Sequence, residues 1–478
     1  MTVKPPGILA LFLKFEKSRI PGWVWVVLLW ALLVFPAIAL RAAHYEEGTV
    51  IALARGAVED GHWLTPYHYG FRFIERPVLL SWIIAALSMI SGEVTLWTVR
   101  IPHILFLLGG GLLIWRLVRS LASEAAALFA ALCFFGSPMI IQKVFTAEPD
   151  VMVSVLLFAA FFIWWGGVAI DRTSVWRWIA VGLVLGLAGL TKGPQPLGYF
   201  TLGIGAFLVI ERRWRDLPGF VLAHLVALVM TLSWYVAVMQ PGDLQQWITH
   251  SRLNSNFLSG AWFARQWQFV SSCVVEFLPG LLLLVVGWAG LWRVRGERRH
   301  QLAFAAMLYA VICTAVLLVW PGSAASRYAM PAAPALATLA GILFDEWKVQ
   351  KPRLIATALT IGILVAAYGV ILGWVAMPLF PDLFQKSRIA AQPILPVRAA
   401  AKGPLYVVHE TLNNNLLVYV PSLIRDIPQD DLAKLTAPSL AILTPSEVEK
   451  LKAARPDLEV TLRAILHEDK ISHLIEIR

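Results

Sequence analysis

Two adjacent glutamates, Glu46 and Glu47, stand directly after the first long apolar run of this 478-residue chain. Two carboxylates at a membrane face can supply a general base or part of a cation site. A third acid, Asp150, lies in the sequence Thr-Ala-Glu-Pro-Asp at the start of a later apolar run. Taken alone, each carboxylate could equally be a solvated group or a helix cap favoured by the helix dipole. The three residues are therefore candidates for catalysis, and the groups around them decide how strongly the sequence supports that role.

Cationic residues occupy similar places at the ends of other apolar runs. Arg76 follows Glu75, and Lys192 lies in the sequence Thr-Lys-Gly-Pro. Further cations occur in two tripeptides, His250-Ser251-Arg252 and Ser326-Arg327-Tyr328. Arginine binds phosphate through paired hydrogen bonds, and lysine binds it as a point charge. Glu75 and Arg76 could also form a simple surface ion pair, and one histidine does not by itself indicate a metal ligand.

The combination of these groups is more specific than its members. Cations that bind phosphate, carboxylates for proton transfer or metal binding, and aromatic side chains for a sugar are the parts of a transferase with a phosphate-linked donor. Ionisable groups at a membrane edge are functional candidates by default. This interpretation requires the groups to lie on one side of a membrane, so it depends on the elements that carry them.

The composition predicts an integral membrane protein. The chain is 58% hydrophobic and 15% charged, with a mean hydropathy of +0.69, whereas a soluble domain has about a quarter of its residues charged. The net charge of +10 resides in short loops between apolar runs. That is the positive-inside pattern, so no nucleic-acid partner is predicted. The three cysteines, Cys133, Cys273 and Cys313, are far apart in apolar segments and predict no disulfide framework.

The predicted topology has about eleven membrane spans, each requiring about 20 apolar residues. The runs begin near residues 22, 101, 124, 151, 175, 196, 217, 269, 301, 328 and 354. Basic clusters after every second run place the N-terminus in the cytoplasm. Pro77–Ile90 is short for a span and is predicted to be an interfacial or re-entrant helix. All the candidate residues then face the extracytoplasmic side, with the loop at 43–100 among them.

Two domains are predicted: a transmembrane catalytic domain, residues 1–380, and a small extracytoplasmic α/β domain, residues 381–478. Five segments of the second domain have the short apolar pattern of strands. They are LYVVHE, LLVYV, LAILT, VTLRAIL and SHLIEIR. The segment PSEVEKLKAA is predicted to be a helix with a serine N-cap. This domain offers no catalytic constellation of its own.

The ordered motifs of residues 22–347 resemble those of GT-C glycosyltransferases. The relevant branch contains the bacterial aminoarabinose lipid A transferases and the dolichyl-phosphate-mannose protein mannosyltransferases. Glu46-Glu47, spaced before Gly61-His62-Trp63, is similar to the family's Asp-Glu, and Ile74 to Trp82 resembles Phe-Glu-Lys-Pro-Pro-Leu-Leu-x-Trp. Glu148-Pro149-Asp150 resembles the family's Thr-Pro-Asp, and Thr191 to Pro194 matches its Thr-Lys-Gly-Pro unchanged. Thr249 to Arg252 resembles a later loop of the family that contains a histidine and an arginine. Tyr328 to Pro331 resembles the family's Tyr-x-x-Pro turn.

The resemblance implies an all-α polytopic membrane protein of GT-C type with a small C-terminal α/β domain. It implies transfer of a sugar from a polyprenyl (undecaprenyl) phosphate to a lipid A, glycan or protein acceptor outside the bacterial inner membrane, with a divalent metal bound at the site. The predicted catalytic residues are Glu46, Glu47 and Asp150; the predicted donor-phosphate ligands are Arg76, Lys192, Arg252, Arg327 and Tyr328; the predicted metal ligands are Glu75, Asp150 and His250.

The chain departs from the family pattern in three places. Glu46 is one methylene longer than the family's aspartate, and Arg76 replaces a lysine, which favours bidentate contact with phosphate. Thr49-Val50 stands where an arginine and a tyrosine are common, and Lys143 or Arg252 could substitute. Two other hypotheses stay open: a transporter or flippase of lipid-linked sugars, and a non-catalytic assembly factor with the same fold.

Overall fold

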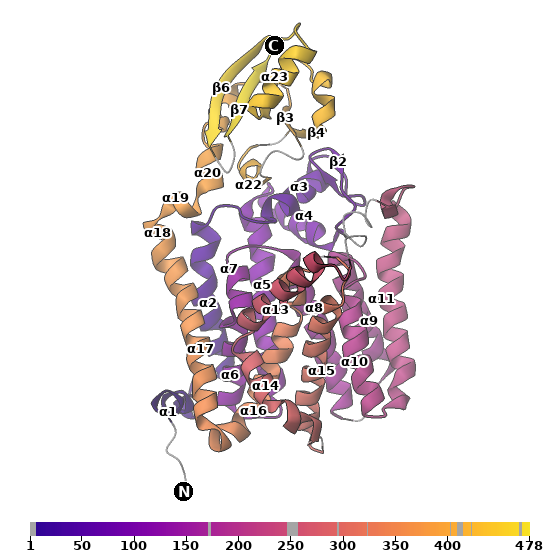
Figure 1. Cartoon of the computed structure of the whole chain (residues 1–478), viewed down its shortest axis with the longest axis vertical. Helices are drawn as coiled ribbons and strands as arrows, with labels where there is room; N and C mark the ends of the chain where they lie inside the picture. The colour runs from indigo at the N-terminus through magenta and orange to yellow at the C-terminus, as the bar shows by residue number, and fades with distance from the viewer. Residues whose placement is uncertain are drawn as a thin grey trace. The chain divides into compact units, whose positions relative to one another are not determined.

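The structure is a computed structural model, mostly helical with a small C-terminal sheet (Figure 1). It describes residues 6–170, 174–245, 257–293, 296–322, 324–401, 403–408, 414–421, 423–467 and 471–478. The chain forms two compact units. Unit 1 comprises Met1–Phe35, His103–Phe145 and Pro149–Leu372, and unit 2 comprises Pro36–Pro102, Thr146–Glu148 and Gly373–Arg478.

Unit 1 is a bundle of apolar helices. The helices that lie wholly or mainly in it are α1 (Gly7–Phe12), η1 (Leu13–Lys17), α2 (Gly22–Leu40), α5 (Leu96–Arg119), α6 (Glu124–Phe135), α7 (Pro138–Val144), α8 (Pro149–Val168), α9 (Val175–Lys192), α10 (Leu197–Ile210), η2 (Trp214–Asp216), α11 (Leu217–Val238), α13 (Gly260–Glu276), α14 (Gly280–Arg293), α15 (Arg298–Leu318), η3 (Ser326–Ala329), α16 (Ala332–Gln350) and α17 (Pro352–Ile371).

Glycines bring α9 close to α11. A Cβ atom on Gly182 would lie 2.6 Å from the carbonyl oxygen of Ala223, and one on Gly186 would lie 2.6 Å from Met230 Sδ. Small residues four apart on one helix face allow two membrane helices to approach closely. Because α9 also packs on α8, the three helices fix the place of Lys192 at the end of α9.

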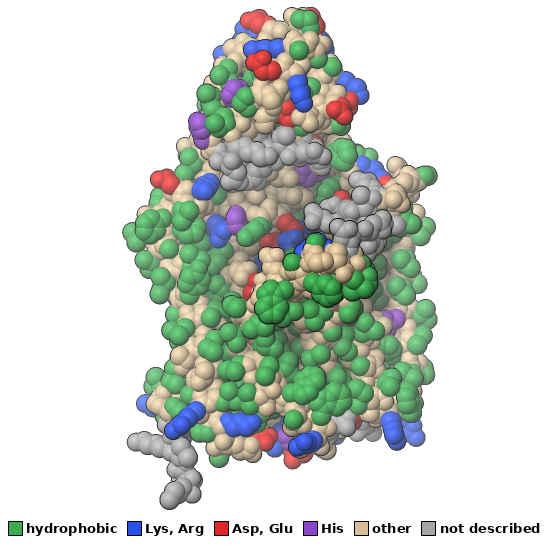
Figure 2. All heavy atoms as spheres, in the orientation of Figure 1, with side chains coloured by type: hydrophobic (Ala, Val, Ile, Leu, Met, Phe, Trp, Pro, Cys, Tyr) green, Lys and Arg blue, Asp and Glu red, His purple; other side chains and the backbone are tan. Residues whose placement is uncertain are grey.

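The apolar surface of unit 1 agrees with membrane insertion. Figure 2 shows hydrophobic side chains over the flank of its helices and charged side chains at their lower ends. Among the described residues, seven helices are long and apolar enough to span a membrane, or up to nine if each of two bent pairs is one span. The bent pairs are α6 with α7 and α13 with α14, which bend by 64° and 96°.

The predicted span count of about eleven is not confirmed among the described residues. Every predicted run coincides with a helix or a bent pair. However, α10 has only 14 residues, and α16 is not among the candidate spans. The run at Pro77–Ile90 forms α4 (Leu79–Ser91), a 13-residue helix too short to be a candidate span. Its place relative to a membrane stays a prediction.

Unit 2 joins the loop after α2 to the C-terminal region, by which we mean residues 381–478. Besides α4, its elements are α3 (Glu47–Val58), β1 (Tyr67–His68), β2 (Phe71–Arg72), η4 (Leu372–Ala376), α18 (Met377–Leu379), α19 (Pro381–Phe384), α20 (Lys386–Ala391), α21 (Ile394–Ala400), β3 (Leu405–Val408), α22 (Asn414–Leu417), β4 (Ile424–Ile427), η5 (Gln429–Lys434), β5 (Ser439–Leu443), α23 (Pro445–Ala454), β6 (Val460–His467) and β7 (Ile471–Ile477).

The C-terminal sheet has five strands in the order β4-β3-β5-β7-β6. Strand β3 runs parallel to β4 and β5, whereas β7 is antiparallel to β5 and β6. One face packs under α23 with Val448 and Leu451, and the other face shares a core with Ala52 of α3 and Tyr69. The loop at 43–76 and the sheet are therefore parts of one core.

Two sequence predictions about the C-terminal region are wrong. The segment LLVYV is not a strand, because its first residues end the helical turn α22 and its carbonyls bond to an arginine of α3. The helix α23 is capped by Thr444 rather than by Ser446. Thr444 and Glu447 form a reciprocal capping box, which satisfies two backbone donors that a serine two positions later could not reach.

Candidate active site

The Glu46-Glu47 turn connects α2 to α3. Tyr45 has a φ of 48°, in the left-handed region, and reverses the chain just before the helix. Glu46 is the N-cap residue of α3, but its side chain makes no capping hydrogen bond. Since N-cap side chains usually accept from the first helical N–H groups, the Glu46 carboxylate is directed to another partner.

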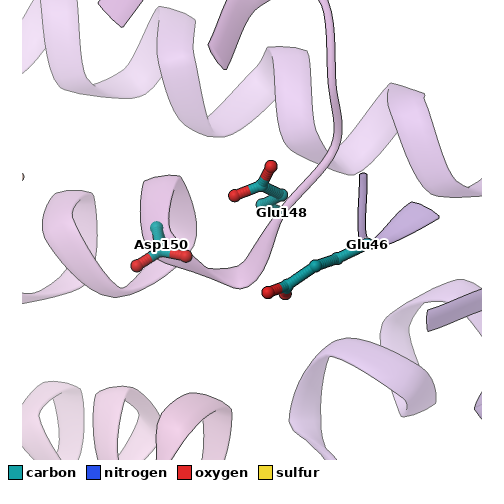
Figure 3. A group of neighbouring side chains, drawn as sticks. All are labelled: Glu46, Glu148 and Asp150. Carbon is teal, nitrogen blue, oxygen red and sulfur yellow. The ribbon is translucent and has the colours of Figure 1, made fainter. Parts of the chain in front are cut away.

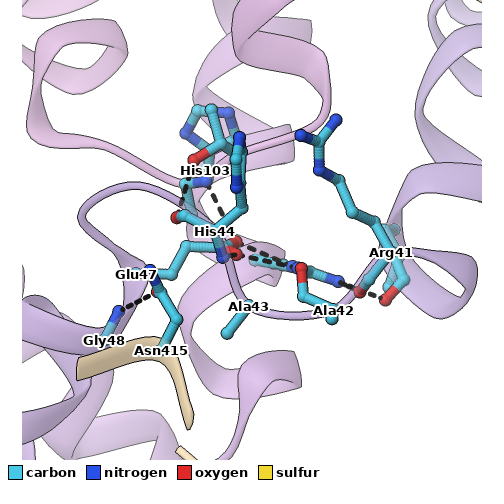
Figure 4. Close-up of polar contacts among 12 residues, drawn as sticks. Arg41, Ala42, Ala43, His44, Glu47, Gly48, His103 and Asn415 are labelled. Atoms are coloured by element: carbon cyan, nitrogen blue, oxygen red, sulfur yellow. Dashed lines mark hydrogen bonds and ion pairs between the residues drawn. The ribbon is translucent and has the colours of Figure 1, made fainter. Parts of the chain in front are cut away.

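Glu47 is fully buried and holds the turn together (Figure 4). Its carboxylate accepts from Arg100 Nε and Nη2, both at 2.8 Å. It also accepts from the backbone N–H groups of His44 at 3.0 Å and Ala147 at 3.1 Å. Both oxygens are thus bonded by guanidinium and backbone donors, so Glu47 holds the turn together, and its predicted catalytic role stays a prediction.

Arg100 completes this network from the start of α5. Its Nη1 donates to the carbonyl oxygens at the end of α2, those of Ile38 and Arg41, at 2.9 Å each, and its Nη2 donates to that of Ala42 at 3.1 Å. The last carbonyls of a helix lack partners in the helix itself and attract cations. One guanidinium therefore fixes both the end of α2 and the carboxylate of Glu47.

Glu46 faces a different cation. Arg76 Nη1 lies 2.5 Å from Glu46 Oε2. Both side chains are partly exposed, at 24% and 16% respectively. Arg76 is placed by the stretch that leads into α4, where Pro77 is buried. The predicted catalytic carboxylate and a predicted phosphate ligand thus form an ion pair with access to solvent.

A second carboxylate approaches Glu46 in unit 2. Glu148 is 2% exposed and offers an oxygen within 4.8 Å of one on Glu46 (Figure 3). Asp150 follows Glu148 after a single proline, and its oxygen is also within 4.8 Å of Glu148. Within unit 2, Glu46 and Glu148 therefore form a close carboxylate pair, which hard divalent cations favour.

In unit 1, Asp150 and Lys192 form an ion pair at the ends of two packed helices. Asp150 lies in the first turn of α8, and Lys192 is the last residue of α9. The ammonium nitrogen of Lys192 also lies 4.4 Å from the centre of the Tyr328 ring in η3. The Arg327 guanidinium lies 5.4 Å from the same ring. Two cations thus flank one aromatic side chain, next to a buried carboxylate.

Comparisons with known proteins agree with the predicted resemblance. The profile of the family described as dolichyl-phosphate-mannose-protein mannosyltransferase matches residues 75–236. The chain superposes on the crystal structure of ArnT from Cupriavidus metallidurans bound to undecaprenyl phosphate with a TM-score of 0.73 at 19% identity, covering 96% of this chain and 98% of that one. The chain has a GT-C fold.

Two bacterial relatives carry the same name, undecaprenyl phosphate-alpha-4-amino-4-deoxy-L-arabinose arabinosyl transferase. That of Pseudomonas paraeruginosa is 28% identical over 269 residues, which cover 54% of this chain and 47% of the relative. That of Edwardsiella ictaluri is 26% identical over 287 residues, covering 57% and 50%. The chain spans about half the length of the curated relatives it matches.

Within this GT-C fold, the predicted site residues that lie together form two groups, one in each unit. Glu46 and Arg76 meet in unit 2, and Asp150, Lys192 and Tyr328 meet in unit 1 with Arg327 beside them. Glu75, a predicted metal ligand, is not in the carboxylate group that contains Glu148, as far as the described residues show. His250 and Arg252 lie outside the described residues. Their predicted roles stay predictions.

The sequence pattern assigns no role to Arg100 or Glu148. Arg100 lies near the start of an apolar run, and a charge in such a place is itself a signal for a functional or structural partner. Glu148 stands where the family pattern has threonine, so the family motif assigns no role to a carboxylate at this position. Both residues are almost fully buried, with 4% and 2% exposure.

The carboxylate group has the chemistry of a cation site. Asp150 uses Oδ1 for Lys192, whereas its buried Oδ2 has no hydrogen-bond partner among the described residues. An unsatisfied buried carboxylate oxygen is costly and is relieved by a cation or a proton. Glu46 and Glu148 in unit 2, and separately Oδ2 of Asp150 in unit 1, are therefore described carboxylate groups with the chemistry to bind a divalent metal.

Proposed function

We propose that this chain is an integral membrane glycosyltransferase of the bacterial inner membrane. It moves a sugar from an undecaprenyl phosphate donor to a lipid A, glycan or protein acceptor on the extracytoplasmic side. The arabinosyl transferase relatives are named for a donor of this class, and the ArnT structure has undecaprenyl phosphate bound. The fold, which is the same as that of ArnT, supports the proposal.

The observation that carries the proposal is the pairing of two predicted phosphate ligands, each with a predicted catalytic carboxylate. Arg76 pairs with Glu46, and Lys192 pairs with Asp150. A donor phosphate competes with a carboxylate for the same cation. When the cation neutralises the bound phosphate, the carboxylate would lose its partner and become free to act. The cations stabilise the charge on the departing polyprenyl phosphate, and Glu46 orients or deprotonates the acceptor.

We propose that both ion pairs serve one reaction. This proposal is supported by the sequence Glu148-Pro149-Asp150. Glu148 lies near Glu46, Asp150 pairs with Lys192, and only one proline separates the two acids along the chain. If a divalent metal binds, Glu46 and Glu148 of unit 2 would be among its ligands, and it would supply further positive charge for the phosphate.

We also propose the eleven-span topology, with a cytoplasmic N-terminus and an extracytoplasmic C-terminal region. Each of the eleven predicted runs coincides with a described helix or bent pair, and the proposed topology takes α10 as a span and α4 as a helix that does not cross the membrane. A periplasmic reporter fused at Gly92, after α4, should be active. A cytoplasmic signal from that fusion would refute this orientation.

The experiment is transfer by the purified full chain in nanodiscs. The donor is undecaprenyl phosphate-linked aminoarabinose, with other undecaprenyl phosphate sugars in parallel, and lipid A is the first acceptor. We expect Glu46→Gln and Asp150→Asn to lose transfer, whereas Glu93→Gln, an exposed glutamate beyond α4, keeps it. Full transfer by both site variants would refute the site. Movement of the lipid-linked sugar across proteoliposomes without transfer would favour a flippase.

A further inference from the structure

Asn415, in the C-terminal region, binds the backbone on both sides of Glu46-Glu47. Figure 4 shows its contact with Gly48. Its Oδ1 accepts from the Gly48 N–H at 3.0 Å, and its Nδ2 donates to the Tyr45 carbonyl oxygen at 3.0 Å. The Asn415 side chain is buried, with 6% exposure. One amide therefore spans the short stretch that presents both glutamates.

The contact with Gly48 supplies a helix cap from a distant part of the chain. Gly48 is the second residue of α3, and its N–H is one of the donors that no helical carbonyl reaches. Glu46 would normally cap such a donor but makes no capping bond. Since Asn415 does this instead, the Glu46 carboxylate is released to face Arg76.

The backbones approach closely at this place. A Cβ atom on Gly48 would lie 2.5 Å from the carbonyl carbon of Asn414 and 2.6 Å from its oxygen. Such distances require a backbone to move, so glycine is needed at position 48 for the amide of Asn415 to reach the turn. The fit joins α22 to the start of α3.

Two further contacts hold the segment that carries Asn415. Arg55, buried in α3, donates to the carbonyl oxygens of Leu417, Val418 and Val420 at 3.0–3.1 Å. The Tyr419 hydroxyl accepts from the Ala43 N–H at 2.7 Å. The segment is thus held by the last turn of α3 and by the chain that precedes α3.

We propose that Asn415 is a positioning residue for Glu46, and that the C-terminal region is thereby a working part of the active site. By holding Tyr45 in its left-handed conformation and capping α3, the amide sets the direction from which the Glu46 carboxylate enters the site. This inference rests on the proposed function for its kinetic consequence. Its structural part is independent of that function.

The structural part is tested by amide hydrogen exchange on the full chain in nanodiscs. Asn415→Ala should speed exchange in the peptide around Gly48 about tenfold, because the lost cap and the lost hold on Tyr45 each shift local opening several-fold. Asn414→Ala is the matched control, since it is the neighbouring asparagine of α22 and no side-chain hydrogen bond of Asn414 is found within the described part of the chain. Equal exchange in the two variants would overturn the proposal. Thermal melting identifies a variant that has lost its fold. If Asn415→Ala has lost its fold, Asn415→Asp provides the test, because it keeps the acceptor for Gly48. Its exchange rate around Gly48 should then lie above that of the wild type but below the roughly tenfold increase expected for Asn415→Ala.

The kinetic part is tested by sugar transfer from undecaprenyl phosphate-linked aminoarabinose. Asn415→Ala should lower kcat about tenfold or more while KM for the donor stays within about twofold, because Arg76 and Lys192 are unchanged. Asn415→Asp should recover part of kcat. Faster exchange with unchanged kcat would overturn the positioning role. No transfer by the wild-type chain would instead count against the proposed function, and the exchange result would still decide whether Asn415 holds the turn.

Discussion

Two neighbouring glutamates, Glu46 and Glu47, each bind an arginine, but the two ion pairs differ in their exposure to solvent. The Arg100 network, made of Arg100, Glu47 and their backbone partners, is almost closed to solvent: its two charged side chains are 5% and 0% exposed. The Arg76 pair, made of Arg76 and Glu46, is 24% and 16% exposed. Identical residue types, adjacent in sequence, therefore stand in two environments.

The difference indicates which glutamate can react. Glu47 has each oxygen bonded by a guanidinium and by a backbone N–H, so it cannot exchange partners without breaking the turn. Glu46 pairs with Arg76, which is partly exposed to solvent, and under the proposed function an incoming donor phosphate would take over this cation. A carboxylate that works in catalysis must be able to change its contacts, and one that supports the fold must not.

The largest effect is expected from breaking the Arg100 network. Arg100→Met leaves the buried Glu47 carboxylate without its cation and the end of α2 without its donors. Removing one partner of a buried pair costs about 3–5 kcal/mol, so we expect a loss of stability of this size and little folded protein. Thermal unfolding in detergent measures it.

Arg76→Met is the matched control for this prediction. It removes the same kind of charge from a partly exposed pair, whose contribution to stability is about 0–1 kcal/mol. Equal destabilisation by Arg100→Met and Arg76→Met would show that the difference in burial between the two ion pairs does not affect their contribution to stability. It would also remove the basis for assigning the two glutamates different roles.

Much of this contrast lies beyond sequence reasoning. Apolar runs, basic loops and ordered motifs predicted the helices, the carboxylates and the cations, because each depends on local composition or spacing. The partners did not follow, since Arg100 is 53 positions from Glu47 and Asn415 is 367 positions from Gly48. No local pattern encodes a pairing at such separations.

The segment LLVYV shows the same limit in the fold. Its β-branched and aromatic residues have strand propensity, but propensity yields to tertiary contacts. Arg55 takes the carbonyls of Leu417, Val418 and Val420, which removes the acceptors that a strand ladder would need. The strand that sequence reasoning missed, β4, lies just beyond and pairs with β3.

The next effect in size concerns the reactive member of the pair. Glu46→Gln should lower kcat about 10²-fold or more, as expected for loss of a general base or an orienting charge. Its melting temperature should remain close to that of the wild type, because the Arg76 pair contributes little to stability. Transfer assays and thermal melting on the same preparation give both values.

Glu46→Asp sharpens this prediction, because it restores the residue of the family pattern. The shorter side chain withdraws the carboxylate from Arg76 but keeps the charge. We expect kcat between those of the wild type and Glu46→Gln. A Glu46→Gln variant with wild-type kcat and a lower melting temperature would place Glu46 with Glu47 as a structural residue.

A smaller effect is expected at the corresponding pair in unit 1. Lys192→Gln leaves Asp150 without its cation and removes one phosphate ligand, so we expect KM for the donor to rise about tenfold, or about 1.4 kcal/mol. Lys192→Arg keeps the charge and should restore most of the affinity. Titration of the nanodisc protein with undecaprenyl phosphate measures binding directly. Unchanged binding by Lys192→Gln would separate this lysine from the donor site.

The smallest effect is expected at Glu59, a carboxylate just beyond the far end of α3 from Glu47. Burial, partly offset by Arg55, raises the pKa of Glu59 above its usual value. The folded state therefore favours the protonated acid, and stability falls as pH rises from the usual pKa of about 4.3 through the raised value. Because about a third of the side chain is exposed, solvent screening limits the effect to a few tenths of a kcal/mol.

Glu59→Gln tests this contrast without touching Glu46 or Glu47. The amide cannot ionise, so the variant should be slightly more stable than the wild type at pH 7 and no more stable at pH 4. Melting temperatures at the two pH values, compared with those of Glu93→Gln, measure the difference. A large loss of stability at pH 7 would mean that Glu59 depends on its ion pair with Arg55 as Glu47 depends on Arg100. Partner geometry, rather than burial, would then separate the carboxylates of this loop.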